Sequence, residues 1–208
     1  MSKLEDVRLN VEKGKTKLIA GIVQEAIDEG NSANDILDTM IEAMGTVGDK
    51  FSSGELFVPE MLIAAKAMSK GVEVLKPLLA AEDTKSLGTC VIGTVAGDLH
   101  DIGKNLVTMM IESAGFTVVD LGVDVSVDQF IEATKENDNV KIVALSALLT
   151  TTMPALKETV KKLKENSDAY KVIVGGAPIS KEFAEEIGAD GFAPDAGGAA
   201  VKAKELVA

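Results

Sequence analysis

The sequence predicts an α/β protein with an additional all-α domain, because its two parts follow different hydrophobic periods. Residues 1–86 repeat apolar side chains at helical spacing, which predicts a four-helix bundle. Residues 87–208 alternate short β-rich runs with helical segments, the rhythm of parallel βαβ units in a doubly wound, five-stranded parallel sheet. The polar stretch AAEDTKS, residues 80–86, interrupts both patterns. We therefore expect two domains, 1–86 and 87–208, with a hinge at residues 82–86.

Four helices are expected in the first domain, joined by short turns that favour antiparallel neighbours. The first two repeat apolar residues every three or four positions, and the second ends at Gly30, a residue type common just past helix C-termini. Asn31 or Ser32 can cap the third helix, which continues through DILDTMIEAMGTVGDKF. Pro59 suits the first turn of the fourth helix.

Five strands are expected in the second domain, in the stretches GTCVIGTV, FTVVDLG, VKIVALSAL, YKVIVGGAP and ADGFAP. A helix follows each of them, in DIGKNLVTMMIESAG, SVDQFIEATKEND, MPALKETVKKLKEN, SKEFAEEIG and AGGAAVKAKELVA. Ser126 is the expected cap of the second of these helices. Cys90 lies inside the first strand, where we expect it to behave as a small buried hydrophobic residue.

Composition narrows the classes of function. The chain of 208 residues is 46% hydrophobic, enough for a sizeable core, and carries a formal net charge of −12. This charge argues against nucleic-acid binding, which needs a basic face. The single cysteine excludes an intrachain disulfide and fits a reducing cytoplasm. The charged start MSKLEDVRLN is unlike a signal peptide, and no run approaches the roughly 18 apolar residues of a membrane span. We therefore expect a cytoplasmic protein without membrane partners.

The loops that follow the strands carry the candidate functional residues. In a doubly wound sheet, ligands bind at the carboxyl ends of the strands. Here those ends carry AGDLHD after the first strand, SALLTT after the third and GGAP after the fourth. His100, the only histidine of the chain, lies in the first of these loops.

Each of these features also has a purely structural interpretation. His100 can be a surface residue, and Asp98 or Asp101 can cap the following helix. Gly175-Gly176 can form only a tight turn. Several familiar sites are excluded, because the chain has no G-x-G-x-x-G, no G-x-x-x-x-G-K-[ST] and no G-x-S-x-G. One histidine and one cysteine without a further soft ligand nearby do not make a zinc site.

Three separated motifs resemble a known fingerprint. In chain order they are Asp98-x-His100-x-x-Gly103, Ser146-x-Leu148 and Gly175-Gly176, separated by 42 and 26 residues. At this spacing they resemble the cobalamin-binding fingerprint D-x-H-x-x-G…S-x-L…G-G, and the run GTVAGDLHDIGKN is similar to the cobalamin module of methionine synthase. The stretch VGDKFSSGELFVPEMLIAAKAM resembles the helical cap that precedes the cobalamin domain in methyl-transferring corrinoid proteins. The resemblance covers nearly the whole chain and implies a helical cap followed by a flavodoxin-like or Rossmann-like sheet domain.

The resemblance implies roles for individual residues. His100 replaces the cofactor's own base as the lower ligand of cobalt, and Asp98 holds the other imidazole nitrogen. Thr152 stands where methionine synthase has a serine that completes this relay. These three are the candidate catalytic residues, and His100 is the candidate metal ligand.

The other candidate cofactor contacts fall into three groups. Ser146 and Thr150 match hydroxyls that contact the nucleotide tail of the cofactor. Glycines leave room where the tail passes close to the backbone, and apolar cap residues shield the upper face. The full set is Gly97, Leu99, Asp101, Ile102, Gly103, Ser146, Leu148, Thr150, Gly175, Gly176 and Ala196 in the sheet domain, with Phe51 and Val58 in the cap.

The implied function is that of a methyl carrier. Such a protein takes a methyl group on cobalt from a substrate methyltransferase that acts on a methylamine, a betaine, methanol or an aryl methyl ether. It passes the methyl group to a second methyltransferase that serves a thiol or a tetrahydrofolate-type acceptor. A reductive activation protein is a further expected partner. The chain then has no independent turnover and acts as a carrier subunit.

Three alternatives stay open at this point. A small subunit of an adenosylcobalamin mutase shares the fingerprint but generally lacks the helical cap. A cobalamin-binding regulator carries a DNA-binding unit and a bundle tryptophan, and this sequence has neither. A receiver or scaffold without a cofactor needs a phosphoacceptor aspartate after the third strand, where this chain has Ser146-Ala-Leu.

Overall fold

The structure, a computed structural model, describes residues 2–79 and 86–208. The chain divides into two compact units, Met1–Lys85 and Ser86–Ala208. The hinge predicted at residues 82–86 lies outside the described residues except for Ser86. Within the described ranges, no helix is both long enough and apolar enough to span a bilayer.

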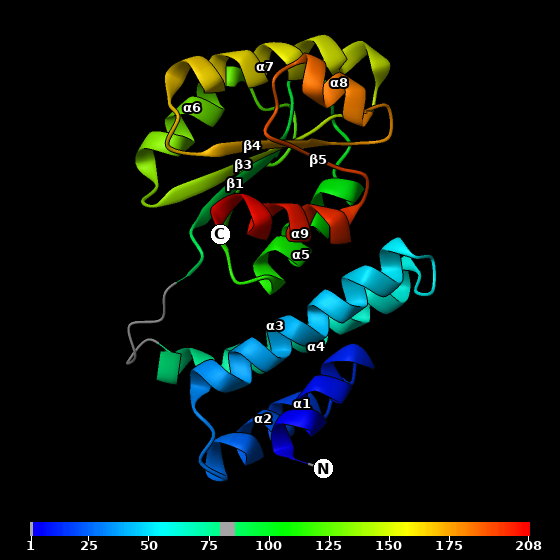
Figure 1. Cartoon of the computed structure of the whole chain (residues 1–208), viewed down its shortest axis with the longest axis vertical. Coiled ribbons are helices and arrows are strands. Elements are labelled where there is room, and N and C mark those ends of the chain that lie inside the picture. The colour runs from blue at the N-terminus through cyan, green and yellow to red at the C-terminus, as the bar shows by residue number, and fades with distance from the viewer. Residues whose placement is uncertain (1, 80–85) are drawn as a thin grey trace. The chain divides into compact units, whose positions relative to one another are not determined.

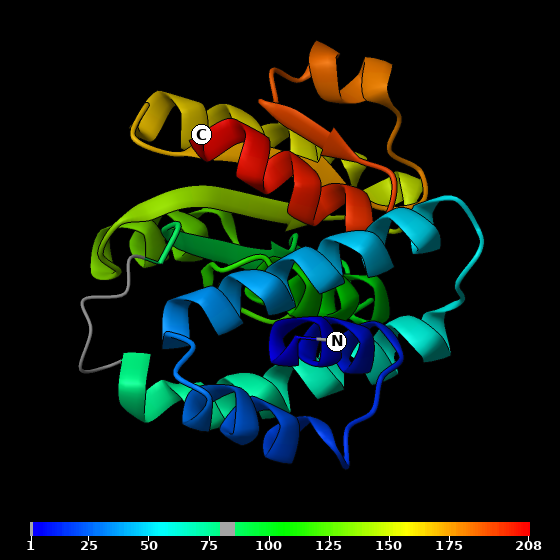
Figure 2. The same ribbon diagram turned by 60° about the horizontal axis from the view of Figure 1, so that its bottom comes forward.

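The first unit contains the four predicted helices. They are α1 (Lys3–Glu12), α2 (Ile19–Asp28), α3 (Ala33–Ser52) and α4 (Val58–Leu79). Ser32 is the N-cap of α3, where its hydroxyl accepts a hydrogen bond from the Asp35 amide at 3.0 Å. The two longest helices, α3 and α4, run antiparallel beside each other, and α1 and α2 pack against them (Figure 2). Their apolar stripes bury aliphatic side chains and methionines, among them Val11, Ile36 and Met40.

The second unit is the predicted doubly wound sheet. Its strands are β1 (Thr89–Thr94), β2 (Thr117–Asp120), β3 (Val140–Ser146), β4 (Lys171–Gly175) and β5 (Gly191–Ala193). Its helices are α5 (Ile102–Ser113), α6 (Val127–Glu136), α7 (Met153–Asn166), α8 (Lys181–Glu186) and α9 (Ala196–Val207), with a short 3-10 turn at Thr150–Thr152. Ser126 caps α6 in a full capping box with Gln129.

All strand pairs are parallel, and the strand order is β2-β1-β3-β4-β5. Helices α6 and α7 cover one face of the sheet, and α5 and α9 cover the other (Figure 1). Because successive strand residues point to opposite faces, Val91 packs in the core shared with Phe130 of α6, while Cys90 and Ile92 face the other side. Burial raises the pKa of the Cys90 thiol to about 12, so this cysteine is a core residue without thiolate chemistry.

The strand order reverses its direction between β1 and β3. The chain steps outward from β1 to β2 and then returns past β1 to place β3 on its other side. At such a switch point the loops that follow the two neighbouring strands diverge and leave a crevice at the carboxyl edge. The sheet therefore places the loop after β1, which carries His100, next to the loop after β3.

The turn after β4 brings two backbone segments into close contact. Gly176 has a φ of +131°, and a Cβ added to it would lie 1.8 Å from the carbonyl oxygen of Ala147. No side chain fits at that position, so the loops after β3 and β4 approach each other only because residue 176 is glycine.

This contact gives a prediction for stability. In the cofactor-free chain, Gly176→Ala lowers the free energy of unfolding by about 2–5 kcal/mol, because it adds backbone strain and a clash with Ala147. Gly188→Ala is the matched control, since Gly188 also has a positive φ (+78°) but has no atom within 4 Å of an added Cβ. The control loses only about 1–2 kcal/mol. Equal losses in urea unfolding would contradict the close approach at Gly176.

Candidate functional site

A tight turn at the end of β1 presents Asp98. The Asp98 amide donates to the Val95 carbonyl at 3.1 Å, and Gly97 between them has a φ of +81°. This is the pattern of a type II turn, whose third position requires a positive φ and hence favours glycine. The turn directs the Asp98 side chain toward the loop after β3.

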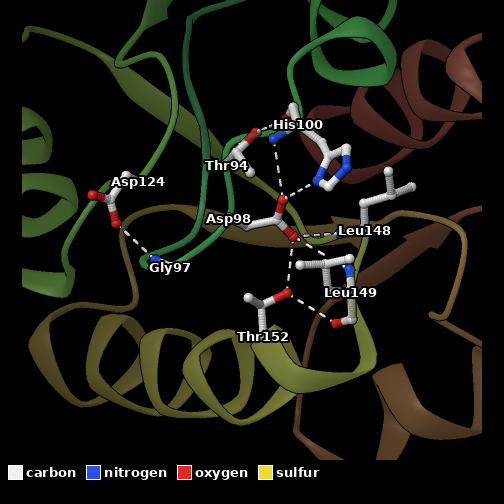
Figure 3. A network of polar contacts seen from close by, with 8 residues as sticks. All are labelled: Thr94, Gly97, Asp98, His100, Asp124, Leu148, Leu149 and Thr152. Atoms are coloured by element: carbon white, nitrogen blue, oxygen red, sulfur yellow. Dashed lines mark hydrogen bonds and ion pairs between the residues drawn. The ribbon is translucent and has the colours of Figure 1, made fainter.

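The carboxylate of Asp98 is fully buried and accepts five hydrogen bonds (Figure 3). Oδ1 accepts from the amide of His100 at 3.1 Å and interacts with the imidazole Nδ1 of the same residue at 2.7 Å. Oδ2 accepts from the amides of Leu148 at 2.7 Å and Leu149 at 3.3 Å, and from the Thr152 hydroxyl at 2.8 Å. One carboxylate thus connects the loop after β1 with the loop after β3.

These donors determine the charge of Asp98. Burial by itself raises the pKa of a carboxyl group, because it disfavours the ionised form. The hydrogen bonds from Leu148, His100 and Thr152 act in the opposite direction and prevail, so the pKa of Asp98 lies well below its ordinary value. Asp98 is therefore a buried anion at neutral pH.

The imidazole of His100 has one nitrogen engaged and one available. An ionised carboxylate only accepts hydrogen bonds, so Nδ1 donates to Asp98 and carries a hydrogen. The side chain is 50% exposed, and within the described part of the chain Nε2 has no hydrogen-bond partner. In the neutral ring this leaves the lone pair of Nε2 directed away from Asp98. A carboxylate behind one imidazole nitrogen is the common arrangement for a histidine that binds a metal through the other.

Apolar side chains from the same two loops and from the first residue of α5 are exposed to solvent. Leu99 and Ile102 are 72% and 77% exposed, and Leu148 and Leu149 are exposed to a lesser degree. Large apolar side chains gathered in this way are typical of a surface that a ligand covers.

The structural interpretation of the aspartates as helix caps is wrong. Asp101 occupies the N-cap position of α5, but its side chain makes no cap hydrogen bond. Asp98 accepts from the His100 amide and from the loop after β3 rather than from the first turn of α5. Thr152 likewise makes no cap bond to α7, because its hydroxyl contacts Asp98 and the Leu149 carbonyl.

The other predicted contacts in the sheet unit lie at the same carboxyl edge. Ser146 and Gly175 end neighbouring strands and are paired in register, Thr150 starts the 3-10 turn, and Ala196 is the first residue of α9. Gly103 lies in the first turn of α5, and a Cβ added there would have no atom within 4 Å. The chain itself does not require a glycine at residue 103, so the open space suits a ligand that passes close to the backbone.

Gly175 and Gly176 differ from Gly103 in this respect. An added Cβ would lie 2.9 Å from the Ala193 carbonyl oxygen at Gly175 and closer still to Ala147 at Gly176. The packing of the protein itself therefore explains why residues 175 and 176 are glycines. Their contact with a cofactor stays a prediction. Phe51 on α3 and Val58, the first residue of α4, belong to the helical unit. Their contact with a cofactor also stays a prediction.

Sequence reasoning missed three polar residues around the site, two of which bond directly to the loop after β1. The buried Thr94 donates through its hydroxyl to the His100 carbonyl at 2.8 Å. Asp124 accepts from the Gly97 amide at 2.7 Å. Lys104 of α5, with its side chain 2% exposed, pairs with Asp120 at the end of β2. The position of Asp124 in the loop after the second strand was the one available signal, because that loop begins at the same carboxyl edge of the sheet.

The donor set fits a corrinoid better than a bare ion. Among the described residues there is no group of three or more His, Cys, Asp or Glu side chains that can hold a metal. A macrocycle that brings its own equatorial nitrogens needs only one axial ligand from the protein, as haem does. One available imidazole nitrogen, flanking apolar side chains and the open space at Gly103 meet that requirement.

Comparison with known proteins agrees with this fit. A family model described as a B12 binding domain matches residues 88–202, and a second model with the same description matches residues 4–76. A corrinoid protein of Desulfitobacterium hafniense (strain Y51) is 38% identical over 100% of this chain and 98% of its own length. Dimethylamine corrinoid protein 3 of Methanosarcina mazei is 47% identical over 79% of this chain and 100% of its own length.

A solved structure shares the fold. The crystal structure of the methanol:cobalamin methyltransferase complex MtaBC from Methanosarcina barkeri contains a chain that matches with a TM-score of 0.83 and 30% identity. The match covers 99% of this chain and 79% of that one. Fold, donor set and relatives agree: the chain belongs to the family of cobalamin-binding, methyl-carrying corrinoid proteins.

Proposed function

We propose that this chain carries a methyl group from a methylamine-specific methyltransferase to a second methyltransferase, which serves a thiol or a tetrahydrofolate-type acceptor. The observation that carries the proposal is the available Nε2 of His100, held by the buried anion Asp98. The cofactor is cobalamin or a related corrinoid, and when bound it supplies the cobalt that accepts and releases the methyl group.

The protein's own residues have separate tasks in this proposal. His100 would bind the cobalt of the cofactor through Nε2. Asp98 fixes the imidazole tautomer and stabilises positive charge on the ring, which makes Nε2 a stronger electron-pair donor to a metal. Thr152 provides the hydroxyl that keeps Asp98 in place, and its 2.8 Å contact shows that the β-branched side chain reaches the carboxylate.

The methyl donor is proposed from the relatives. Dimethylamine corrinoid proteins match across most of the chain, and the matched structural complex acts on methanol. A methylamine is therefore the first donor to test, followed by methanol, betaines and aryl methyl ethers. Because cobalt must stay reduced to accept a methyl group, a reductive activation protein is proposed as a third partner.

The two cobalamin-dependent alternatives have no specific support. The helical B12 binding domain at residues 4–76 precedes the sheet unit, whereas small mutase subunits are expected to lack such a cap. The sequence has neither the bundle tryptophan nor the basic module that a DNA-binding regulator of this kind is expected to carry.

The donor is tested by methyl transfer. After a chemical reductant has brought the cobalt to its reduced state, cobalamin-loaded chain, dimethylamine methyltransferase from a methanogen and a thiol-specific acceptor methyltransferase should together convert dimethylamine and the thiol into methylamine and the methyl thioether. Replacing dimethylamine by methanol, with the methanol enzyme as partner, is the comparison. Transfer from methanol but not from dimethylamine would contradict the proposed donor.

The role of His100 is tested by spectroscopy. Reconstituted with hydroxocobalamin, the unaltered chain should show the absorption spectrum of histidine-ligated cobalt, and His100→Ala the spectrum of a base-off, water-ligated form. Asp168→Ala is the matched control, because Asp168 is exposed in the loop before β4, outside the candidate cofactor contacts, and its replacement leaves the imidazole in place. Identical spectra of the unaltered chain and His100→Ala would remove His100 from the cobalt.

The charge of Asp98 gives a prediction for stability. In Asp98→Asn one carboxylate oxygen becomes an NH2 group, which cannot accept hydrogen bonds from the N–H groups that it faces. The free energy of unfolding at pH 7 should therefore fall by about 2–4 kcal/mol. Asp101→Asn, in the same motif but exposed, should change it by about 0.5 kcal/mol or less.

The pH dependence has a definite sign. The folded-state pKa of Asp98 is lowered, so its stabilisation is present above the ordinary aspartate pKa of about 4 and is lost as the pH falls below that value. The difference between the unaltered chain and Asp98→Asn should therefore shrink from pH 6 toward pH 3, as measured by urea unfolding. A constant difference over this range would mean that Asp98 is not a buried anion.

A further inference from the structure

The loop that carries Asp98 is held by a second aspartate from the neighbouring loop. Segment 122–125 follows β2 and runs alongside the end of β1. The Thr94 amide donates to the Gly122 carbonyl at 3.0 Å, the Val125 amide donates to the Thr94 carbonyl at 2.9 Å, and Val95 and Val125 form a parallel bridge. This pairing places Asp124 opposite the turn at Gly97.

Asp124 and the turn exchange two hydrogen bonds. Oδ1 of Asp124 accepts from the Gly97 amide at 2.7 Å (Figure 3). The Asp124 amide donates to the Asp98 carbonyl at 3.0 Å. Asp124 has a φ of +55°, which is one of two positive values among the non-glycine residues that the structure describes. That conformation is unfavourable for most side chains, although aspartate and asparagine tolerate it. The two hydrogen bonds therefore hold Asp124 in an unfavourable backbone conformation, in which it contacts the turn that carries Asp98.

The two bonds complete the fixing of the Asp98 backbone. The amide of Asp98 is bound to Val95 and its carbonyl to Asp124, while its carboxylate is held by the loop after β3. His100 depends on this frame, because its own amide and Nδ1 both bind the Asp98 carboxylate. A shift of the turn at Gly97 thus moves the imidazole that faces the cofactor.

We propose that Asp124 is a positioning residue for the axial ligand: through Gly97 and Asp98 it sets how firmly His100 holds cobalt. The inference rests on the proposed role of His100 as that ligand. Loss of the Oδ1 acceptor frees the turn, so the imidazole is presented less well and a larger fraction of bound corrinoid lacks the histidine ligand. Asp124 itself does not touch the cofactor in this proposal.

Three variants separate the acceptor from the backbone strain. Asp124→Asn keeps the Oδ1 acceptor and tolerates the positive φ, so it should behave like the unaltered chain. Asp124→Gly relieves the strain but removes the acceptor. Asp168→Gly is the matched control, because Asp168 is an exposed aspartate in the loop before β4, at the amino edge of the sheet.

The first measurement uses the cofactor-free chain. In amide hydrogen exchange followed by NMR, the Gly97 amide should be protected in the unaltered chain, in Asp124→Asn and in Asp168→Gly. Its protection should fall on the order of three- to tenfold in Asp124→Gly, as expected for loss of an exposed charge-assisted hydrogen bond. An unprotected Gly97 amide in the unaltered chain would overturn the proposal before any variant is made.

The second measurement uses the corrinoid-loaded chain. In the cobalt(II) state, electron paramagnetic resonance distinguishes cobalt with an axial nitrogen from cobalt without one. The ratio of nitrogen-free to nitrogen-ligated cobalt should rise by about three- to tenfold in Asp124→Gly and stay unchanged in Asp124→Asn and Asp168→Gly.

The outcomes separate the two proposals. Suppose that the unaltered chain shows an axial nitrogen. If the ratio of nitrogen-free to nitrogen-ligated cobalt then does not change in Asp124→Gly, or changes equally in Asp124→Asn, the positioning role alone is overturned. An unaltered chain without axial nitrogen, matching His100→Ala, would instead overturn the proposed role of His100.

Discussion

The site depends on one buried charge. Asp98 is fully buried, ionised and surrounded by five hydrogen-bond contacts, two to His100 and three to the loop after β3. An ionised carboxylate without hydrogen-bond donors in that position would be strongly unfavourable, so the charge of Asp98 depends on the donors around it. Because the backbone amides of Leu148 and Leu149 are directed at Oδ2, the two loops hold each other in place. The orientation of the histidine follows from this arrangement, since an anion at Nδ1 keeps the hydrogen there and leaves the lone pair of Nε2 available.

The fold makes this charge possible by its topology. The reversal of strand order between β1 and β3 brings together residues 50 positions apart in the chain, and the crevice at the carboxyl edge lets one side chain reach both loops. Small residues complete the arrangement. Gly97 permits the turn that directs Asp98 inward, and Gly176 permits the loop after β4 to contact Ala147. At the same edge, the exposed Leu99 and Ile102 flank His100, whose imidazole is half exposed. The proposed cofactor site thus combines one available imidazole nitrogen with an exposed apolar surface.

Much of this could be predicted from the sequence, because the relevant signals are local. Hydrophobic periods predicted all four helices of the first unit and the order of strands and helices in the second. Residue types predicted the cap at Ser126 and left Asn31 or Ser32 for α3, of which the structure shows Ser32. The link between Asp98, His100 and Thr152 came from resemblance to a family, and the structure brings these three together. The supporting contacts of Thr94, Lys104 and Asp124 could not be predicted, since each depends on a partner that tertiary structure places beside it. The packing reason for Gly175-Gly176 could not be predicted either, because an added Cβ there would clash with backbone carbonyls of other segments.

The central claim is that the Asp98 anion fixes the tautomer of His100, and the chain offers a direct test because His100 is its only histidine. In cofactor-free protein labelled with ¹⁵N-histidine, NMR at a pH where the ring is neutral reports which nitrogen carries the hydrogen. The account predicts the hydrogen on Nδ1, with Nε2 unprotonated. A ring protonated on Nε2 would mean that Asp98 does not direct the imidazole, and the proposed axial ligand would lose its structural basis.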